Sequence, residues 1–381
     1  MHPVRGGGGE YGGATLKSGG NHHLRLSGAV ALKITLLFTV VAITCLLLNQ
    51  SSYPFEFYRK SNSFSWLKDS NICPPCENHD TQSNASSSFQ NLPLSGKEEN
   101  RELEETLRKA LMKDNKTVII TTLNAAWTEP NSMFDLFLES FRVGNGTEDL
   151  LKHVVFGAVD RTAYNRCLAK RLHCYAITTD GLDFSGNAPY MTKHYLKMMW
   201  RRIDFLRTVL QLGYDFIFTD VDVMWLRNPL ERFYPDGEFQ IACDRKWTGY
   251  TNLSNSLNGG FKYVKSNNRT IQFYNYWYTG QDYFPGKNEQ DVLIKIKNSP
   301  FIPRIGLKLW FLNPAYFGGF CEPSQDLDRV ITMHANCCVG LNKKIRAIKM
   351  VIHDWKRYMS LPAHQRINST IRSWTVPRIC R

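Results

Sequence analysis

From about Leu107 onward, short β-branched or apolar runs alternate with longer segments of helical periodicity, and this alternation strongly constrains the fold. Val118–Thr122 and His153–Val159 have the composition of strands, and Thr192–Leu212 repeats apolar residues at the spacing of one helix face. Strands that alternate with helices predict a mainly parallel sheet covered on both faces. The expected fold class is therefore α/β.

One predicted strand ends in two carboxylates. The apolar run Phe216–Phe218 is followed by Asp220 and Asp222, with one apolar residue between them. In extended backbone, side chains two positions apart project to the same face, so we expect both carboxylates at one spot beyond the strand. Ligands of open α/β sheets bind at that edge, and paired oxygen ligands suit Mg²⁺ or Mn²⁺. The alternative is a solvated turn, because Asp-x-Asp is a common pattern.

The N-terminal part of the chain has the composition of a membrane-anchored tail. Residues 1–28 are polar and Gly-rich, as in a disordered tail, and residues 29–48 are apolar over a length that spans a bilayer. Lys and Arg outnumber acidic residues before the apolar stretch, which predicts a cytosolic tail and a transmembrane signal anchor. A cleaved signal peptide is the alternative, disfavoured because no small-x-small site follows Leu48.

Residues 49–105 are rich in Ser, Asn and Gln and predict a flexible stem. This stem holds a domain, residues 106–381, in the lumen.

Nine of ten cysteines follow the anchor, which favours disulfides in an oxidising compartment. Adjacent Cys337 and Cys338 are expected to bond to different partners, and the odd count leaves one free or intermolecular thiol. Sequons for N-glycosylation agree with a lumenal address; they lie at Asn84, Asn115, Asn145, Asn252, Asn268 and Asn368.

The charge of the chain narrows its partners. The net charge is +13, and Leu341–Arg381 contains ten Lys and Arg against Asp354 alone. Such a surface attracts nucleotide phosphates or acidic polymers, although a solvated helix face explains it equally well. A lumenal domain has no access to nucleic acid, so nucleic acid is not an expected partner.

Several segments around the Asp220 motif resemble nucleotide-diphospho-sugar glycosyltransferases of the GT-A fold. The chain is most similar to the plant nucleotide-diphospho-sugar transferase family, glycosyltransferase family 77, in its poorly characterised branch. The match runs from about Val118 to Met359 through Tyr195–Arg202, the Asp220/Asp222 strand, Ile241–Asp244, Asn258–Phe261, Glu289–Asp291, Phe317–Cys321 and Thr332–Gly340. This resemblance implies a Rossmann-like GT-A domain, a UDP-sugar donor, a divalent metal (Mn²⁺ or Mg²⁺) and transfer with retention of configuration.

The resemblance also implies a set of metal ligands. Asp220 and Asp222 match the metal-binding pair, and Asp220 is also a candidate for contact with the nucleotide. His334 matches a third ligand that related enzymes take from near the C-terminus. Without the resemblance, a lone His beside Met and Cys is typical of a core or capping residue.

In related enzymes a Gly and then a Lys follow this His, and the Lys contacts the diphosphate. Gly340 and Lys343 reproduce that order here after a longer first gap. Lys344 is the alternative to Lys343, and the sequence leaves the choice open.

Two segments match positions that face the donor sugar in related enzymes. They are Glu289, Gln290 and Asp291, the catalytic candidates, and Asn258, Gly259 and Gly260. A retaining transferase needs a nucleophile or a polar stabilising group on the β-face of the sugar. The alternatives are acidic residues that complement a helix dipole, for the first segment, and a plain turn, for the second.

Further candidates for donor contact lie at the end of the first strand and on the long helix. Thr121, Thr122 and Asn124 end a strand at the edge where nucleotides bind. Arg202 lies 18 residues before Asp220 in the sequence, with a surface salt bridge as the alternative.

The leading hypothesis is a Golgi glycosyltransferase that adds a sugar to a cell-wall polysaccharide or a glycoprotein acceptor, acting alone, as a homo-oligomer or in a transferase complex. The alternative is a non-catalytic partner of such a complex that binds nucleotide sugar or glycan. A metal-dependent hydrolase is disfavoured because no second carboxylate cluster appears.

Overall fold

The computed structural model describes residues 96–113, 116–177, 184–186, 188–245, 247–366, 373–375 and 380. The predicted tail, the predicted anchor at 29–48 and most of the predicted stem lie outside these residues. No helix of the described part of the chain is long and apolar enough to cross a membrane.

The central feature is a seven-stranded sheet with strand order β3-β2-β1-β4-β7-β6-β8. Its strands are β1 (Thr117–Leu123), β2 (Val154–Ala158), β3 (His173–Ala176), β4 (Asp215–Thr219), β6 (Phe239–Arg245), β7 (Ser256–Val264) and β8 (Leu309–Leu312). All neighbouring strands pair in parallel except β7, which runs antiparallel to both β4 and β6. The predicted α/β class with a mainly parallel sheet is confirmed.

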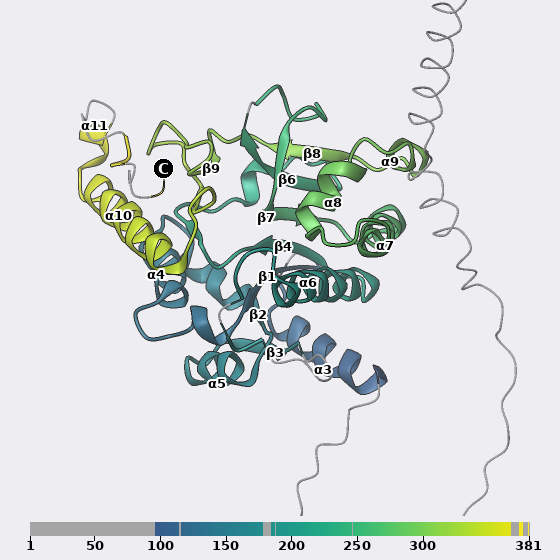
Figure 1. The fold of residues 1–381 in the computed structure, drawn as a ribbon. Coiled ribbons are helices and arrows are strands. Elements are labelled where there is room, and N and C mark those ends of the chain that lie inside the picture. The colour runs from purple at the N-terminus through teal and green to yellow at the C-terminus, as the bar shows by residue number, and fades with distance from the viewer. Residues whose placement is uncertain are drawn as a thin grey trace, which may run out of the picture. The chain divides into compact units, whose positions relative to one another are not determined.

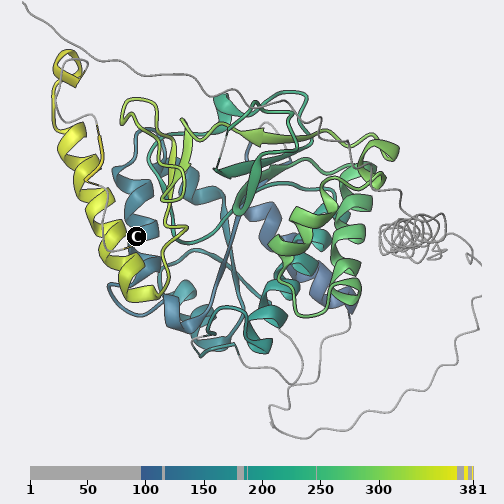
Figure 2. The same ribbon diagram turned by 45° about the horizontal axis from the view of Figure 1, so that its top comes forward.

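Helices cover both faces of this sheet (Figure 1, and Figure 2 with the top turned toward the viewer). The apolar cluster on one face includes residues of α3 (Gly96–Lys109), α6 (Lys193–Gln211), α7 (Asn268–Tyr283), α8 (Glu289–Ile296) and α9 (Phe301–Arg304). The cluster on the other includes residues of α4 (Met133–Val143), α5 (Arg161–Ala169) and α10 (Leu341–Met359). Short helices lie at η1 (Ala125–Trp127), η2 (Glu148–His153), η3 (Leu230–Arg232) and α11 (Ala363–Arg366).

Strand β4 shows why the sequence runs apolar here without a break. Phe216 and Phe218 belong to the cluster under α6 and α7, whereas Ile217 belongs to the cluster under α4 and α10. A central strand buried on both faces needs apolar residues at every position. The same alternation puts Asp220 in line with the α6 face of the sheet.

A second sheet of three strands completes the edge where β4 ends. It contains β5 (Val223–Trp225), β9 (Phe317–Gly319) and β10 (Thr332–His334), in the order β5-β10-β9. Strand β5 starts directly after Asp222, and β10 ends at His334, whose register partner is Val223. This antiparallel pairing brings His334 next to Asp222 although they are far apart in the sequence.

The folded domain begins before the predicted boundary at residue 106. Helix α3 starts at Gly96, and its residues Leu103 and Leu107 are buried in the core. The segment 96–105 is therefore not part of a flexible stem, because it is helical and its Leu103 packs in the core one helical turn before Leu107.

Three disulfides lie in the described residues: Cys167–Cys174, Cys321–Cys337 and Cys338–Cys380. Cys337 and Cys338 thus bond to different partners, as expected from their adjacency. Cys243 is the free cysteine of the described part, and it is buried.

Replacement of Leu103 tests whether the segment 96–105 of α3 belongs to the domain. Leu103→Ala should lower the free energy of unfolding by about 2–5 kcal/mol, because it leaves a cavity under the sheet. Glu105→Ala, on the exposed side of the same helix, should change it by less than about 0.5 kcal/mol. Chemical denaturation measures both free energies of unfolding. Equal stability of the two variants would contradict the assignment of this segment to the folded domain.

Candidate functional site

Asp220, Asp222 and His334 converge on one point at the edge of the sheet, with one ligand atom from each within 4.8 Å of the others. His334 Nε2 lies 3.2 Å from Asp222 Oδ1 and 4.0 Å from Asp220 Oδ2. The predicted convergence of the two carboxylates is confirmed, but its reason is different. Strand β4 ends at Thr219, and a turn closed by Val223 N–H on the Asp220 carbonyl (3.1 Å) directs both side chains inward.

The site is buried and charged. Asp222 is 2% exposed, and although burial opposes its ionisation, Lys344 and His334 hold its pKa well below the usual range. Burial lowers the pKa of His334, but the charge and hydrogen bond of Asp222 outweigh that effect and raise it. The Asp222 carboxylate is thus ionised across the physiological range, as a metal ligand must be.

The backbone leaves room for a cation here. Gly260 faces the cluster, and a Cβ on it would lie 2.4 Å from His334 Cε1 and 2.7 Å from Asp220 Oδ2. Only glycine fits between the two side chains. Two carboxylates and an imidazole form a donor set that suits Mn²⁺, so the residues fit the metal that the sequence implied.

The cation beside the cluster is Lys344 and not the predicted Lys343. The Lys344 ammonium lies 2.5 Å from Asp222 Oδ2, whereas the Lys343 side chain is exposed. Both residues lie in the first turn of α10, which starts after Gly340 at a positive φ of 95°. One residue is 100° of helix rotation, which turns Lys343 away from the site when Lys344 faces it.

Arg202 joins the metal candidates to the start of α8. Its guanidinium forms ion pairs with Asp220 (2.7 Å) and with Glu289. Arg202 and Glu289 are 7% and 4% exposed, so the alternative of a surface salt bridge for Arg202 is wrong. Arg202 Nε and Glu289 Oε2 are buried without a hydrogen-bond partner in the described structure. One hydrogen-bond donor and one acceptor at this end of the site are thus free to bind a ligand.

The segment Asn258–Gly260 lies between the metal candidates and α8. The Gly260 carbonyl accepts from Asp220 N–H (2.7 Å), and Gly259 N–H donates to Gln290 Oε1 (2.8 Å). Gln290 thus contacts this segment, and Glu289 contacts Arg202. Asp291 contributes its main-chain N–H to the cap by Asn288; no contact among the described residues brings its carboxylate to the cluster.

The candidates at the end of β1 lie at the correct edge of the sheet. β1 pairs with β4 in parallel, Ile120 opposite Phe218, so Thr121 and Thr122 lead to the edge where Asp220 lies. Thr121 Oγ1 is buried without a described partner. Asn124 donates to the carbonyls of Phe184 and Gly186.

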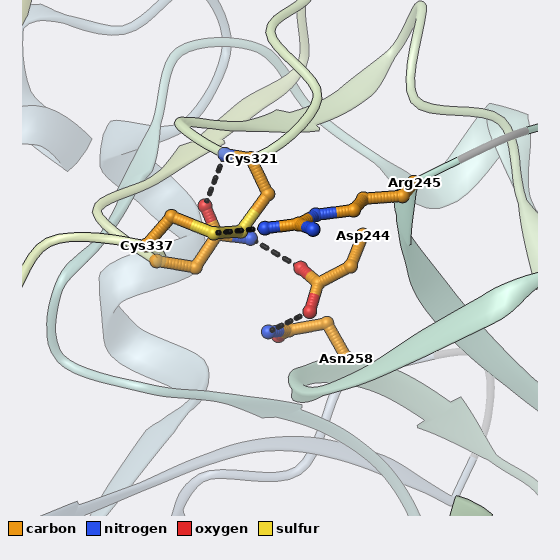
Figure 3. Close-up of a disulfide and its surroundings, with 6 residues drawn as sticks. Asp244, Arg245, Asn258, Cys321 and Cys337 are labelled. Atoms are coloured by element: carbon orange, nitrogen blue, oxygen red, sulfur yellow. Dashed lines mark hydrogen bonds between the residues drawn. A yellow bond between two sulfur atoms is a disulfide. The ribbon is translucent and has the colours of Figure 1, made fainter. Parts of the chain in front are cut away.

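Sequence reasoning gave no role to Asp244 at the end of β6. Its carboxylate accepts from Asn258 (3.3 Å) and Asn336, and burial raises its pKa. Figure 3 shows it beside Asn258 and close to the Cys321–Cys337 disulfide. A pocket at this point reaches His334 of the three metal candidates; its lining includes Asp244, Asn258, Phe261, Phe317, His334 and Asn336. The sequence feature that could have identified Asp244 is a carboxylate at the end of an apolar strand.

The sequence analysis also gave no role to Lys262. It lies on β7 with 1% of its surface exposed, next to the cluster of Arg202, Asp220 and Glu289. A lysine in an otherwise apolar and aromatic run, Phe261–Val264, was the signal in the sequence.

A family model described as nucleotide-diphospho-sugar transferase matches residues 149–348, which contain most of this site. The uncharacterized protein At4g15970 of Arabidopsis thaliana is 51% identical over 284 residues, which cover 74% of each chain. The chain belongs to the nucleotide-diphospho-sugar transferase family. A second uncharacterized A. thaliana protein, At1g28695, is 42% identical over 73% of this chain and 87% of its own length.

Relatives of this transferase with named activities match over shorter stretches. The UDP-galactose:fucoside alpha-3-galactosyltransferase of Dictyostelium discoideum is 37% identical over 68 residues, 17% of this chain and 10% of that protein. Solved glycosyltransferase structures are more distant. Mouse xyloside xylosyltransferase 1 has a TM-score of 0.36 and 11% identity, and covers 58% of this chain and 98% of its own. The family assignment rests on the sequence matches and not on this low TM-score.

Two neighbouring glycines test whether the cluster of this transferase binds a metal. Gly260→Ala should weaken Mn²⁺ binding by about 10- to 100-fold, because the added methyl group displaces His334 or Asp220. Gly259→Ala should leave it unchanged, since its Cβ would meet only Gln290 Oε1 at an ordinary 3.4 Å. Electron paramagnetic resonance of free Mn²⁺ measures both affinities. Equal affinities would remove this cluster as the metal site.

Proposed function

We propose that this chain is an active glycosyltransferase of the GT-A type. It transfers a sugar from a UDP-sugar to a glycan or glycoprotein acceptor, depends on Mn²⁺ or Mg²⁺, and retains the anomeric configuration. The family membership supports sugar transfer from a nucleotide donor. The observation that carries the metal-dependent part is the convergence of Asp220, Asp222 and His334 beside Gly260, where a Cβ would displace His334 or Asp220.

The proposed reaction breaks the bond between the anomeric carbon of the sugar and the diphosphate oxygen, and forms a bond from that carbon to the oxygen of an acceptor hydroxyl. UDP leaves with the bonding electron pair, and the hydroxyl proton is released. A bound divalent cation would neutralise the diphosphate as it leaves. Lys344, next to Asp222, supplies a further positive charge on the same side of the site.

Arg202, Glu289 and Gln290 lie on the side of the cluster away from Lys344's helix and supply polar groups for the sugar. Arg202 pairs with Glu289 and with Asp220, so the sugar end and the metal end share one buried ion-pair network. The unpaired Glu289 Oε2 and Arg202 Nε are the groups that we assign to the donor sugar. Such fixed groups stabilise charge without reorganising during the reaction.

We also propose the finer assignments that the sequence suggested. These are glycosyltransferase family 77, a Golgi location, a type II anchor at residues 29–48 and a cell-wall polysaccharide or glycoprotein acceptor. The beta-arabinofuranosyltransferase RAY1 of A. thaliana is 36% identical over 66 residues, 16% of this chain and 12% of that protein. The three disulfides agree with an oxidising lumen.

UDP release tests the proposed activity. The secreted domain, residues 49–381, should release UDP from at least one of UDP-glucose, UDP-galactose, UDP-xylose and UDP-arabinose with Mn²⁺, and not with EDTA. Asp222→Asn should lower the rate by about 100-fold or more, because it removes a charged ligand. Asp236→Asn, an exposed carboxylate, is the matched control and should keep the wild-type rate.

The same assay separates the competing function. Tight binding of UDP by a domain that releases none from any donor, with a panel of cell-wall oligosaccharides present, would favour the non-catalytic partner. Turnover that survives EDTA and Asp222→Asn would contradict the metal-dependent mechanism.

Removal of residues 1–48 tests the anchor. The full chain, expressed in plant cells, should pellet with membranes and dissolve only in detergent, since an apolar stretch of this length spans a bilayer. The chain without these residues, behind a cleavable signal, should be secreted in soluble form. Pelleting of both forms to the same extent would contradict the anchor.

A further inference from the structure

Lys262 is a lysine in a position that otherwise calls for an apolar residue. It lies in the register of β7 opposite Phe218 of β4, and its ammonium is 4.0 Å from the centre of the Phe218 ring. The ring of Trp277 lies on the same side, 5.8 Å away. A methionine would fill this space without the cost of removing a charge from water.

No ion pair in the described part of the chain offsets the free-energy cost of burying the Lys262 ammonium. No carboxylate of the described residues forms a salt bridge with Lys262. Burial, and after it the charge of Arg202, lower its pKa to about 7, against the opposite effect of Asp220 and Glu289. A buried polar group that is expensive for the fold is more often explained by function than by stability.

The Lys262 side chain makes one described hydrogen bond, and it is to the candidate site. Its Nζ donates to the Gly259 carbonyl at 2.9 Å, while Gly259 N–H donates to Gln290 Oε1 at 2.8 Å. Gly259 thus links Lys262 to Gln290. An amine donates this hydrogen bond whether it is protonated or neutral, so the link holds on both sides of neutral pH.

The backbone around Gly259 needs such a support. The pairing of β7 with β6 shifts at this point: Ile241 lies opposite Lys262, and Ala242 opposite Asn258. Three residues, Gly259 to Phe261, therefore bulge out of the β6 ladder. Bulges re-aim the chain next to active sites, and two glycines in this one leave it without side chains to fix its path.

We infer that Lys262 is a positioning residue, which holds the Gly259 bulge and, through it, Gln290 against the donor sugar. This inference rests on the proposed function, because Gln290 has a sugar to face only in a transferase. Lys262 itself touches neither the metal candidates nor any solvent-exposed part of the site. Its effect on the reaction is therefore indirect, through the geometry of one peptide group.

The chain contains a matched control. Lys297 is also a buried lysine with a lowered pKa, and its Nζ donates to a main-chain carbonyl of the same segment, that of Asn255 (2.5 Å). Its described contacts include none of Asp220, Asp222, His334, Arg202 or Glu289. Lys262 and Lys297 thus hold two carbonyls four residues apart, and only one of them is linked to Gln290.

The test compares Lys262→Met with Lys297→Met in the secreted domain. Three quantities are measured: the melting temperature, kcat and KM for the best donor of the panel, and by calorimetry the Kd of UDP and of the intact UDP-sugar with Mn²⁺. Lys262→Met should lower kcat by about 10- to 100-fold, since a displaced positioning group has effects of this size. It should also abolish the difference in Kd between the UDP-sugar and UDP, while the Kd of UDP stays unchanged.

The melting temperature separates positioning from structure. Lys262→Met should melt at the wild-type temperature or above it, because the variant buries no charge. Lys297→Met should keep kcat within about twofold of wild type. Unchanged kcat and unchanged Kd difference in Lys262→Met would overturn the inference, as would an equal loss in both variants. A wild-type domain that neither releases UDP nor distinguishes UDP-sugar from UDP would instead contradict the proposed function.

Discussion

The buried ion pairs of Arg202 hold the site together. One guanidinium on α6 binds Asp220, which follows β4, and Glu289, which starts α8. Three elements that are adjacent in space but separated in sequence thus meet at one planar group, whose fork matches two carboxylates. Loss of one partner from such a buried network leaves a charge uncompensated, at a cost of about 3–5 kcal/mol. This contact ties the first residue of α8 to Asp220.

Each carboxylate of the candidate metal site faces at least one basic side chain. Lys344 and His334 face Asp222, and Arg202 faces Asp220. The charges of Lys344 and His334 hold the pKa of buried Asp222 well below its usual range, although burial opposes its ionisation. In the proposed reaction, Asp220, Asp222 and His334 would hold a divalent cation, and Lys344 would then be available for the diphosphate.

Several residues of the site are costly for the fold. Lys262 is buried without an ion pair, Glu289 Oε2 lacks a described partner, and Gly260 gives up a side chain in the middle of a strand. Natural proteins accept such local costs where function requires them. Lys262, Glu289 and Gly260 lie around Asp220, at the edge where we place the active site.

The sequence by itself determined the alternation of strands and helices, the two-sided burial of β4 and the position of Asp220 and Asp222 at its end. These follow from periodicity and composition, which are local properties. The resemblance to a family added His334, Glu289 and Gln290, all of which the structure brings to the site. The stem boundary failed because α3 is amphipathic and charged, and only its packing shows that Leu103 and Leu107 are core residues.

Only the tertiary structure decided the remaining points. Which of Lys343 and Lys344 faces the cluster depends on the rotation of α10, and which cysteine pairs with which depends on loop paths that no local pattern records. The contact of His334 with Asp222 arises from the pairing of β10 with β5, and the role of Lys262 from a bulge in β7. Each is a contact between residues distant in the chain, and the packing of the whole domain sets its geometry.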